Sequence, residues 1–434
     1  MAWIIWTPNQ EIEFPGKLVY TPEDGITLEF MCSAGQKFGK SSYIYGALAT
    51  GEKCTLLGDF DSAHFGFHFG EISIYKGKPK FYAAIFGVHT TPDEKFPGFS
   101  LDITNFQEFC HPQGWKHLAK YSTEPLFKSK IDNLEISIIN TGKFSYLGKN
   151  LENLFHCENK DVVEKISKAI FEISQEHKDE EILQRKDIGW ELWGESSIEM
   201  CYSEISKNIL LLEHLIALLI FSPVRRTDAS ILRRSNEVEG KFERLPLLTS
   251  LFDISKHKIE VIQREISNFH QAITPRTINN FSEVISNWFK EYDAYQSFVS
   301  QIANRFGRYH DHELRALIVL HLVQLEAISI SLGNHKDKYN FPLEKYDKTN
   351  IRDLIGSIFE LNDNTKIGEN LSRLRGEIAH LAASSKILSK IGPMGLLKIS
   401  RCLEIIIASH IYERLEIPSA NIAEFQRKEI PIGR

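Results

Sequence analysis

The sequence predicts an α+β protein, with a mainly antiparallel β domain followed by an all-α helical bundle. Residues 14 to about 150 consist of short apolar runs separated by polar turns, as in antiparallel strands. After residue 205, apolar residues recur at spacings of three and four, as on one face of a helix. The 434-residue chain is 42% hydrophobic and 25% charged, which is typical of a folded protein of two or three domains.

The β pattern begins with "GKLVY" (16–20), the turn "TPEDG" (21–25) and "ITLEFMC" (26–32). "YIYGAL" (43–48) and "CTLLGDF" (54–60) repeat it. We also expect a hairpin around "KGKP" (76–79) and a later one within 134–146. Charge density rises between 150 and 200. We therefore place the domain boundary near 200, with a β-rich domain at 1–200 and a helical domain at 201–434.

The helical pattern begins with "ILLLEHLIALLIFS" (209–222), which is shorter than the ~20 residues of a membrane span and predicts a buried helix. Residues 285–306 place large apolar side chains on one helical face, and 312–332 are apolar enough for a central bundle helix. Further helices are expected at 351–363, around 371–380 and at 395–417. This order predicts a helical bundle.

Several functional classes lack their signatures. The N-terminus has neither the basic start nor the long apolar region of a signal peptide, so we expect a cytoplasmic protein without a membrane partner. Walker, Rossmann and G-x-S-x-G motifs are absent, and no cofactor is expected. The net charge of −6 means that any nucleic-acid contact must come from a local basic patch.

The stretch "LSRLRGEIAH" (371–380) places two arginines shortly before a histidine. Its apolar residues form a seam at spacings of three, four and three: Leu371, Leu374, Ile378 and Leu381. At ~100° per residue, Arg373 and His380 fall opposite that seam, and Arg375 lies at its margin. An imidazole moves protons near neutral pH and a guanidinium binds phosphate, so this spacing suits phosphoryl chemistry. Other pairs, such as Arg305 with His310, share the spacing, and most such pairs are solvated helix faces.

With "LIVLHLVQLEAISI" on one helix and "LSRLRGEIAH" on a later one, the helical half resembles a HEPN domain of the type found in ApeA-like anti-phage proteins. "PGKLVYTPEDGITLEF" and "YIYGALATGEKCTLLGDF" are similar to the N-terminal domain of the same proteins. The resemblance assigns a HEPN core to about 280–434 and a sensing or regulatory role to the β-rich domain.

The resemblance implies a metal-independent endoribonuclease that acts as a homodimer, or a higher even oligomer, with a shared cleft. Arg375 and His380 match its motif as catalytic residues, and Arg373 is a nearby supporting residue. Glu326 matches an acidic position and would orient the site; a structural ion pair is the equal alternative. Gly376 stands where active members often have Asn, which leaves room for an inert domain.

The implied chemistry is attack of the ribose 2′-hydroxyl on the adjacent phosphate with departure of the 5′-oxygen. It needs a proton acceptor, a proton donor and a cation. One His380 supplies one proton-transfer group, and two copies across a dimer supply both. Arg375 would hold the phosphate.

Two other clusters have weaker signals. The stretch "RRTDASILRR" gathers Arg225, Arg226, Arg233 and Arg234 around an expected loop or helix start. These are candidate RNA-binding residues, although a solvated basic segment is the more ordinary reading. The histidines of "HFGFH" (64–68), and Cys110 with His111 and His117, lack the four ligands of a standard zinc site. No metal site is therefore predicted.

The resemblance thus implies an abortive-infection effector that cleaves cellular RNA and is controlled by its β domain, with a phage-derived protein as the expected trigger. The alternative is an inert HEPN module that dimerises and binds RNA or a nucleotide. A third option is a carbohydrate- or peptide-binding β domain on a helical oligomerisation stalk.

Overall fold

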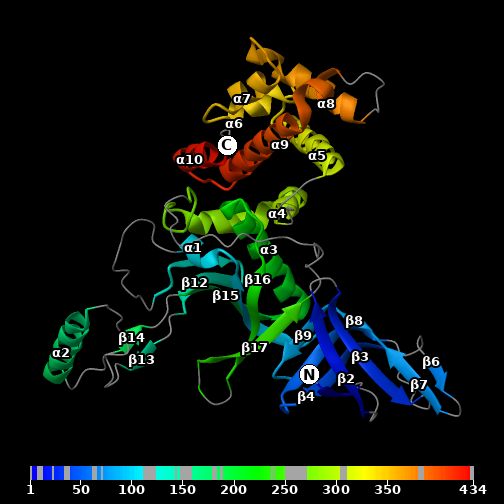
Figure 1. Ribbon diagram of the computed structural model, residues 1–434, viewed down its shortest axis with the longest axis vertical. Coiled ribbons are helices and arrows are strands. Elements are labelled where there is room, and N and C mark those ends of the chain that lie inside the picture. The colour runs from blue at the N-terminus through cyan, green and yellow to red at the C-terminus, as the bar shows by residue number, and fades with distance from the viewer. Residues whose placement is uncertain are drawn as a thin grey trace.

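A computed structural model describes most of the chain (Figure 1). The described residues are 2–6, 13–21, 24–33, 40–60, 66–69, 72–110, 124–141, 144–146, 159–177, 183–185, 189–235, 238, 240–249, 271–303, 310–379 and 386–430. Antiparallel β-sheets are formed by strands between residues 2 and 249, and a helical region follows. The predicted fold class is confirmed.

The strands fall in two groups along the chain. The first group is β1 (Ala2–Trp6), β2 (Glu13–Thr21), β3 (Gly25–Ser33), β4 (Ser41–Leu48), β5 (Lys53–Phe60), β6 (Gly66–Phe69), β7 (Ile72–Gly77), β8 (Lys80–Phe81) and β9 (Ala83–Phe86). The second is β10 (Lys95–Ile103), β11 (Phe127–Ile131), β12 (Leu134–Asn140), β13 (Phe144–Tyr146), β14 (Leu183–Arg185), β15 (Trp190–Cys201), β16 (Arg226–Arg234) and β17 (Phe242–Thr249).

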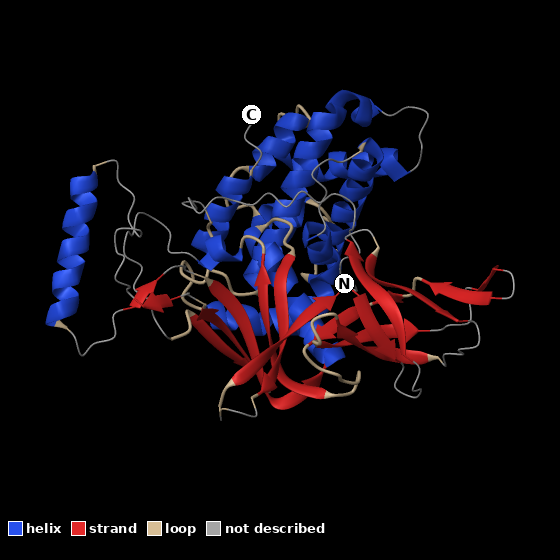
Figure 2. Ribbon diagram, turned by 60° about the horizontal axis from the view of Figure 1, so that its bottom comes forward, coloured by secondary structure: helices blue, strands red, loops and turns tan. Residues whose placement is uncertain are grey.

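Strand β17 joins the two groups into one continuous sheet. Its first half pairs with β16, up to Pro246 opposite Ser230, and its last residues pair with β9, beginning at Leu247 opposite Ile85. The full order is β11-β12-β15-β10-β16-β17-β9-β5-β4-β1-β2-β3-β7-β6, with β8 also on β3, while β13 and β14 pair with each other. Figure 2 shows these strands on one side of the molecule and most helices on the other.

Two of the predicted strand–turn–strand units form hairpins. Strand β2 pairs with β3 across the "TPEDG" turn, and β4 pairs with β5. The expected hairpin around "KGKP" is wrong, because β7 and β8 both pair with β3. The chain stays beside β3 at this point, where the Leu28 N–H donates to the Pro79 carbonyl at 3.1 Å. The expected hairpin within 134–146 is also wrong, since β12 lies between β11 and β15.

The β part continues beyond residue 200, where the sequence suggested a boundary. The predicted buried helix is confirmed as α3 (Tyr202–Ile220). After it, however, β16 and β17 return to the sheet. The segment expected to be a loop or helix start is therefore strand β16, because its buried run Ala229–Leu232 fits a central strand whose charged residues lie at its two ends.

The remaining helices form the C-terminal region, apart from two that lie in the β part. Those two are α1 (Phe106–Cys110) and α2 (Lys160–Glu176). The C-terminal helices are α4 (Phe281–Ala303), α5 (Asp311–Ser331), α6 (Asn340–Tyr346), α7 (Ile351–Ile358), α8 (Ile367–Ala379), α9 (Lys386–Arg414) and α10 (Ser419–Glu429), with a 3-10 turn η2 (Asn364–Lys366) before α8.

One hydrophobic core runs from the sheet into the helical region. It includes β10, β15, α3, α4 and α9, and a smaller core lies among β2–β5, β8 and β9. Polar contacts also join α4 to α3. Trp288 of α4 donates to the Leu211 carbonyl of α3 at 2.7 Å, and the Tyr292 hydroxyl lies 2.9 Å from His214 Nδ1. The helical region is thus packed on the β part through α3.

Helix α5 has one buried and one exposed apolar face. It was expected to be a central bundle helix, but Leu320, Val323 and Ile330 on its outer face are 39%, 42% and 44% exposed. Within the described residues, α5 is the one helix whose length and hydropathy fit a bilayer span, and 39% of that stretch is buried inside the protein. Such a test is also met by core helices of proteins that never enter a bilayer.

Candidate functional site

Helix α8 holds Arg375 at the margin of a buried seam, as its spacing predicted. Leu371 and Leu374 are fully buried, and Ile378 packs on the core. The side chain of Arg373 is 63% exposed, whereas that of Arg375 is 36% exposed. Packing of α8 on the core therefore directs Arg375 along the bundle surface towards α5.

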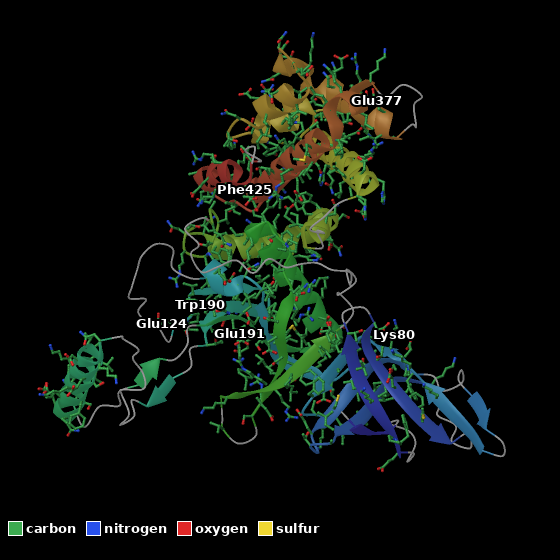
Figure 3. All side chains as sticks on the ribbon, in the orientation of Figure 1. Lys80, Glu124, Trp190, Glu191, Glu377 and Phe425 are labelled. Atoms are coloured by element: carbon green, nitrogen blue, oxygen red, sulfur yellow. The ribbon has the colours of Figure 1, made fainter. Side chains whose placement is uncertain are left out.

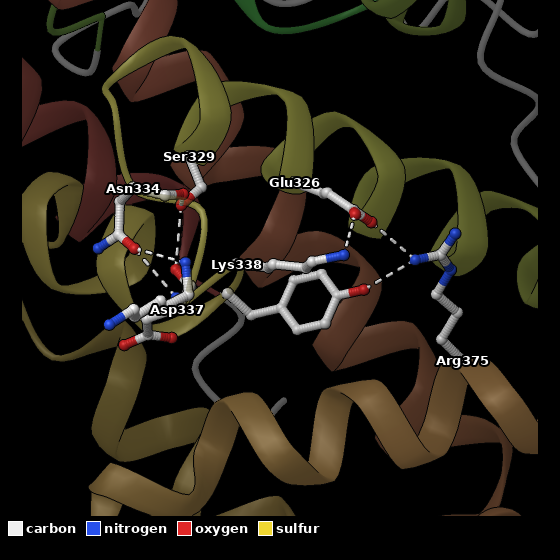
Figure 4. A network of polar contacts seen from close by, with 8 residues as sticks. Glu326, Ser329, Asn334, Asp337, Lys338 and Arg375 are labelled. Carbon is white, nitrogen blue, oxygen red and sulfur yellow. Dashed lines mark hydrogen bonds and ion pairs between the residues drawn. The ribbon is translucent and has the colours of Figure 1, made fainter.

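The structure brings Arg375 together with Glu326 of α5, 49 residues earlier in the sequence (Figure 4). Arg375 Nη1 donates to Glu326 Oε2 at 2.8 Å and to the Tyr339 hydroxyl at 3.0 Å. The other carboxylate oxygen, Oε1, pairs with Lys338 Nζ. One carboxylate thus lies between two cations, and a buried tyrosine completes the cluster.

The charges in this cluster stabilise one another. The hydrogen bond from Lys338, and then that from Arg375, lowers the pKa of the Glu326 carboxyl below its ordinary value. The hydrogen bond to Tyr339, followed by the pairing with Glu326, raises the pKa of Arg375. At neutral pH the carboxylate is therefore ionised and the guanidinium is charged. The three charged side chains carry a net charge of +1.

The α5–α6 loop that carries Lys338 and Tyr339 is held by its own polar side chains. Ser329 Oγ donates to the carbonyls of Asn334 and Asp337 at 2.8 and 3.0 Å. Asn334 Oδ1 accepts from the Asp337 N–H at 3.0 Å. Asn340, the first residue of α6, donates through Nδ2 to the Thr365 carbonyl and accepts from the Gly368 N–H, both at 2.8 Å. This loop is therefore fixed to the start of α8, the helix that carries Arg375.

His380 lies outside the described residues, directly after the last residue of α8. Before residues 380–385, Glu377 of α8 (Figure 3) accepts from the Ile387 and Leu388 N–H groups of α9 at 2.9–3.1 Å. Its carboxylate thereby satisfies backbone donors at the start of α9. The chain is thus anchored on both sides of residues 380–385.

Gly376 follows Arg375 in the middle of α8. A Cβ built at this position meets no atom within 4 Å. Packing therefore does not require glycine at this position. Within the described part of the chain, no steric reason explains why glycine stands where active HEPN members often have Asn.

Arg373 is not part of the Glu326 cluster. It pairs with Glu369 one turn earlier on its own helix. His310, the histidine of another Arg–His spacing, lies at the N-cap of α5, where its backbone N–H donates to Glu313 at 2.8 Å. Arg373 and His310 thus have their bonding partners outside the Glu326 cluster.

The four arginines of "RRTDASILRR" are not gathered into one patch. Strand β16 separates Arg226 from Arg233 by seven residues, which is about 23 Å along an extended strand. Arg226 is 17% exposed and binds both oxygens of Glu213 at 2.8 and 2.9 Å. Arg233 pairs with Glu243 at 2.6 Å and Arg234 lies 3.8 Å from Glu199, while the Arg225 N–H donates to Thr104. The bidentate ion pair between Arg226 and Glu213 thus joins β16 to α3.

The described residues include no group of three or more His, Cys, Asp or Glu side chains that suits a metal ion. Cys110 is buried in the core at the end of α1, where burial raises the pKa of its thiol well above the ordinary value. His64, His111 and His117 lie outside the described residues, as does the side chain of His68.

Lys338 and Tyr339 were missed at the sequence level. They lie in the polar link "LGNHKDKYNFPLEK", which predicts only a connection between helices. A basic and an aromatic residue side by side in a loop are a weak signal for a site. Their proximity to Arg375 depends on how α5, α6 and α8 pack.

The comparisons with known proteins agree with the resemblance seen in the N-terminal sequence. A family model described as ApeA N-terminal domain 1 matches residues 3–288, which is more than half of the chain and ends within α4. No curated protein and no solved structure matches the chain significantly. The chain therefore belongs to the family of proteins that contain ApeA N-terminal domain 1.

Proposed function

We propose that this protein is an anti-phage effector whose C-terminal helical region forms a HEPN dimer and cleaves cellular RNA without a metal ion. Its family supports the defence setting. The observation that carries the nuclease proposal is the setting of Arg375, a guanidinium held on one side near the end of α8, shortly before His380.

Arg375 is held in a way that suits phosphate binding. Its bonds to Glu326 and Tyr339 use both hydrogens of Nη1. No other hydrogen bond of this guanidinium is found within the described residues. The Nε and Nη2 edge carries three further N–H groups, and such an edge binds a phosphate through two parallel bonds. Glu326 and Tyr339 then act as positioning residues, since they fix the side of the guanidinium that points away from substrate.

In the proposed reaction, the 2′-oxygen of a ribose attacks the adjacent phosphorus, and the bond from phosphorus to the 5′-oxygen breaks. A neutral His380 accepts the 2′-hydroxyl proton, and a protonated His380 donates one to the leaving 5′-oxygen. The products are a 2′,3′-cyclic phosphate and a 5′-hydroxyl. Arg375 offsets the negative charge that grows on the phosphate in the transition state.

The two protonation states call for two copies of His380, and α5 offers a surface on which a second chain can pack. Its exposed apolar residues follow the four-three spacing of a helix-pairing seam: Ala316, Leu320, Val323, Ala327 and Ile330. Val323 and Ile330 are three and four residues from Glu326, so the seam lies beside the Arg375 site. Pairing through this seam would bring the sites of two chains close together.

In this proposal the β domain controls the nuclease, because an unregulated ribonuclease is toxic to its own cell. The continuous core through α3 and α4 supports mechanical coupling between the two parts. The competing function is a catalytically inert module that binds RNA or a nucleotide, for which Gly376 is the sequence indication.

The proposal is tested by incubating purified full-length protein with total RNA, with and without EDTA, and analysing the ends of the products. We expect cleavage in both conditions and cyclic phosphate ends. Products with 5′-phosphates would indicate metal-assisted hydrolysis instead. Binding without cleavage, with or without an added phage lysate, would favour the inert module.

Substitutions then distinguish the Arg375–His380 site from the other arginines and histidines that share its spacing. His380→Ala should lower cleavage at least ~100-fold, the low end for a positioned acid–base group, and Arg375→Ala should be comparably damaging. Arg375→Lys should lower cleavage less than Arg375→Ala does, because lysine keeps the positive charge but cannot donate the two parallel hydrogen bonds of a guanidinium. Arg373→Ala and His310→Ala are controls with mild effects. If His310→Ala abolishes cleavage and His380→Ala does not, the assignment of the site is wrong.

A further inference from the structure

Lys338 and Arg375 flank one carboxylate, and each keeps donors that the carboxylate does not use. The ammonium of Lys338 has three N–H donors and pairs with Glu326 Oε1. Arg375 keeps its Nε and Nη2 edge, as described above. The side chains of Lys338 and Arg375 are 46% and 36% exposed, against 20% for Glu326. The donors are therefore accessible, while the carboxylate is largely covered.

The position of Lys338 is fixed more firmly than an ordinary surface ion pair requires. Its neighbour Asp337 is held by Asn334 on one side and accepts from the Asn340 N–H at 3.0 Å on the other. Tyr339, the next residue, is 4% exposed and bonded to Arg375. An exposed ion pair alone contributes only about 0–1 kcal/mol. The loop thus holds a solvent-facing cation in place beside Arg375.

The geometry of the pair indicates two phosphates rather than one. The Glu326 carboxylate lies between the two cations, one on each oxygen. A single phosphate placed between the two cations would have to displace this carboxylate. Two anions on the outer sides of the cations leave the carboxylate in place. A nucleic-acid strand carries one anion at every nucleotide, so neighbouring phosphates of one strand can supply both anions.

We propose that Lys338 binds the phosphate next to the one held by Arg375, so that the site recognises at least two consecutive phosphates of an RNA strand. This inference rests on the proposed function. Lys338 therefore raises the affinity for an RNA strand with several phosphates and not the affinity for the scissile linkage alone. It is a substrate-binding residue outside the reacting atoms, and the chemical class of its ligand is a phosphodiester or terminal phosphate.

The first test compares two substrates in a sequence that the wild-type protein cleaves: a dinucleoside monophosphate, and the same dinucleotide with an added terminal phosphate at its 5′ or 3′ end. Lys338→Ala should lower kcat/KM about tenfold for one of the phosphorylated substrates, mainly through KM, which corresponds to about 1.4 kcal/mol. For the dinucleoside monophosphate the change should stay below about twofold. Lys338→Arg should retain most of the activity.

Lys336→Ala is the matched control, because Lys336 is an exposed lysine of the same loop outside the Glu326 cluster. It should leave both substrates unaffected. An equal loss on both substrates in Lys338→Ala would show that Lys338 merely holds Glu326 in place, and no loss on either would show no role in binding. Both outcomes overturn the inference without touching the proposed cleavage.

A second test does not depend on cleavage. A fluorescent ten-nucleotide RNA is titrated with full-length His380→Ala protein at several salt concentrations. Loss of one phosphate contact lowers the slope of log K against log salt by about 0.7 for a single strand. We expect this decrease for Lys338→Ala and not for Lys336→Ala. An unchanged slope overturns the inference, even if the protein proves to be an inert binding module and the nuclease proposal itself fails.

Discussion

Glu326→Gln is the substitution that best separates a positioning residue from a simple ion pair. Glutamine keeps the size of the side chain, but its single carbonyl oxygen accepts from only one of the two cations, and its NH₂ group repels the other. Tyr339 still accepts from Arg375, whereas the bond from Arg375 to residue 326 is either lost or weakened to one with a neutral acceptor. We expect cleavage to fall about 10- to 100-fold, the range for a misplaced catalytic group.

The effect on stability should be small. Hydrogen bonds to charged groups contribute about 1.5–3 kcal/mol, but Lys338 and Arg375 are each more than one third exposed. Solvent screening therefore reduces the loss to about 1 kcal/mol or less. Unfolding entropy is about 2.1 cal/mol/K per residue, so for a chain of 434 residues the melting temperature should fall by only about 1 °C. Activity should thus respond far more strongly than stability.

Single-turnover cleavage of a labelled RNA at saturating enzyme, together with thermal melts, measures both quantities. Glu369→Gln is the matched control, because it removes the exposed ion pair with Arg373 on the same helix. In an Arg375→Ala background, Glu326→Gln should cost no further activity, since both act through one guanidinium. If Glu326→Gln cleaves as fast as the wild type, or its effect adds to that of Arg375→Ala, Glu326 does not position Arg375.

Three further predictions concern α8, α5 and a buried histidine. Gly376→Ala should stabilise the protein by about 0.5–1 kcal/mol in urea unfolding, because a methyl meets open space in mid-helix; reduced cleavage would show that the site needs glycine. Val323→Glu places a charge on the exposed apolar seam of α5, so it should yield monomers in light scattering and lower cleavage. An unchanged dimer would show that this seam does not form the dimer interface. Burial lowers the pKa of His410 to about 4; the unfolded state then binds the extra proton as pH falls below ~6.5, and stability should drop by about 2 kcal/mol from pH 7 to 5. His214, whose pKa burial also lowers to about 4, should contribute a similar drop of its own. His410→Asn should therefore remove about half of the combined dependence in urea unfolding, and an identical slope would contradict the shift.

The amino-acid pattern alone determined the features that depend on neighbours along the chain. The three-four spacing in 371–378 predicted that Leu371 and Leu374 are buried and that Arg375 lies at the edge of the seam, and both are confirmed. The apolar run at 209–222 predicted a buried helix, which is α3. The turn at "TPEDG" predicted the β2–β3 hairpin. Periodicity and turn chemistry are local, so a single sequence carries them.

Only the tertiary structure decided which distant segments meet. "KGKP" has the residues of a turn, yet β3 is long enough to pair with the strands on both sides of it. The arginines of "RRTDASILRR" look like one basic patch until an extended strand spaces them apart and Glu213 binds Arg226. Lys338 and Tyr339 became part of the candidate site only because α6 is tied to α8 while α5 supplies Glu326. Such contacts depend on the packing of surfaces made by residues far apart in the chain, and spacing along one sequence does not encode that distance.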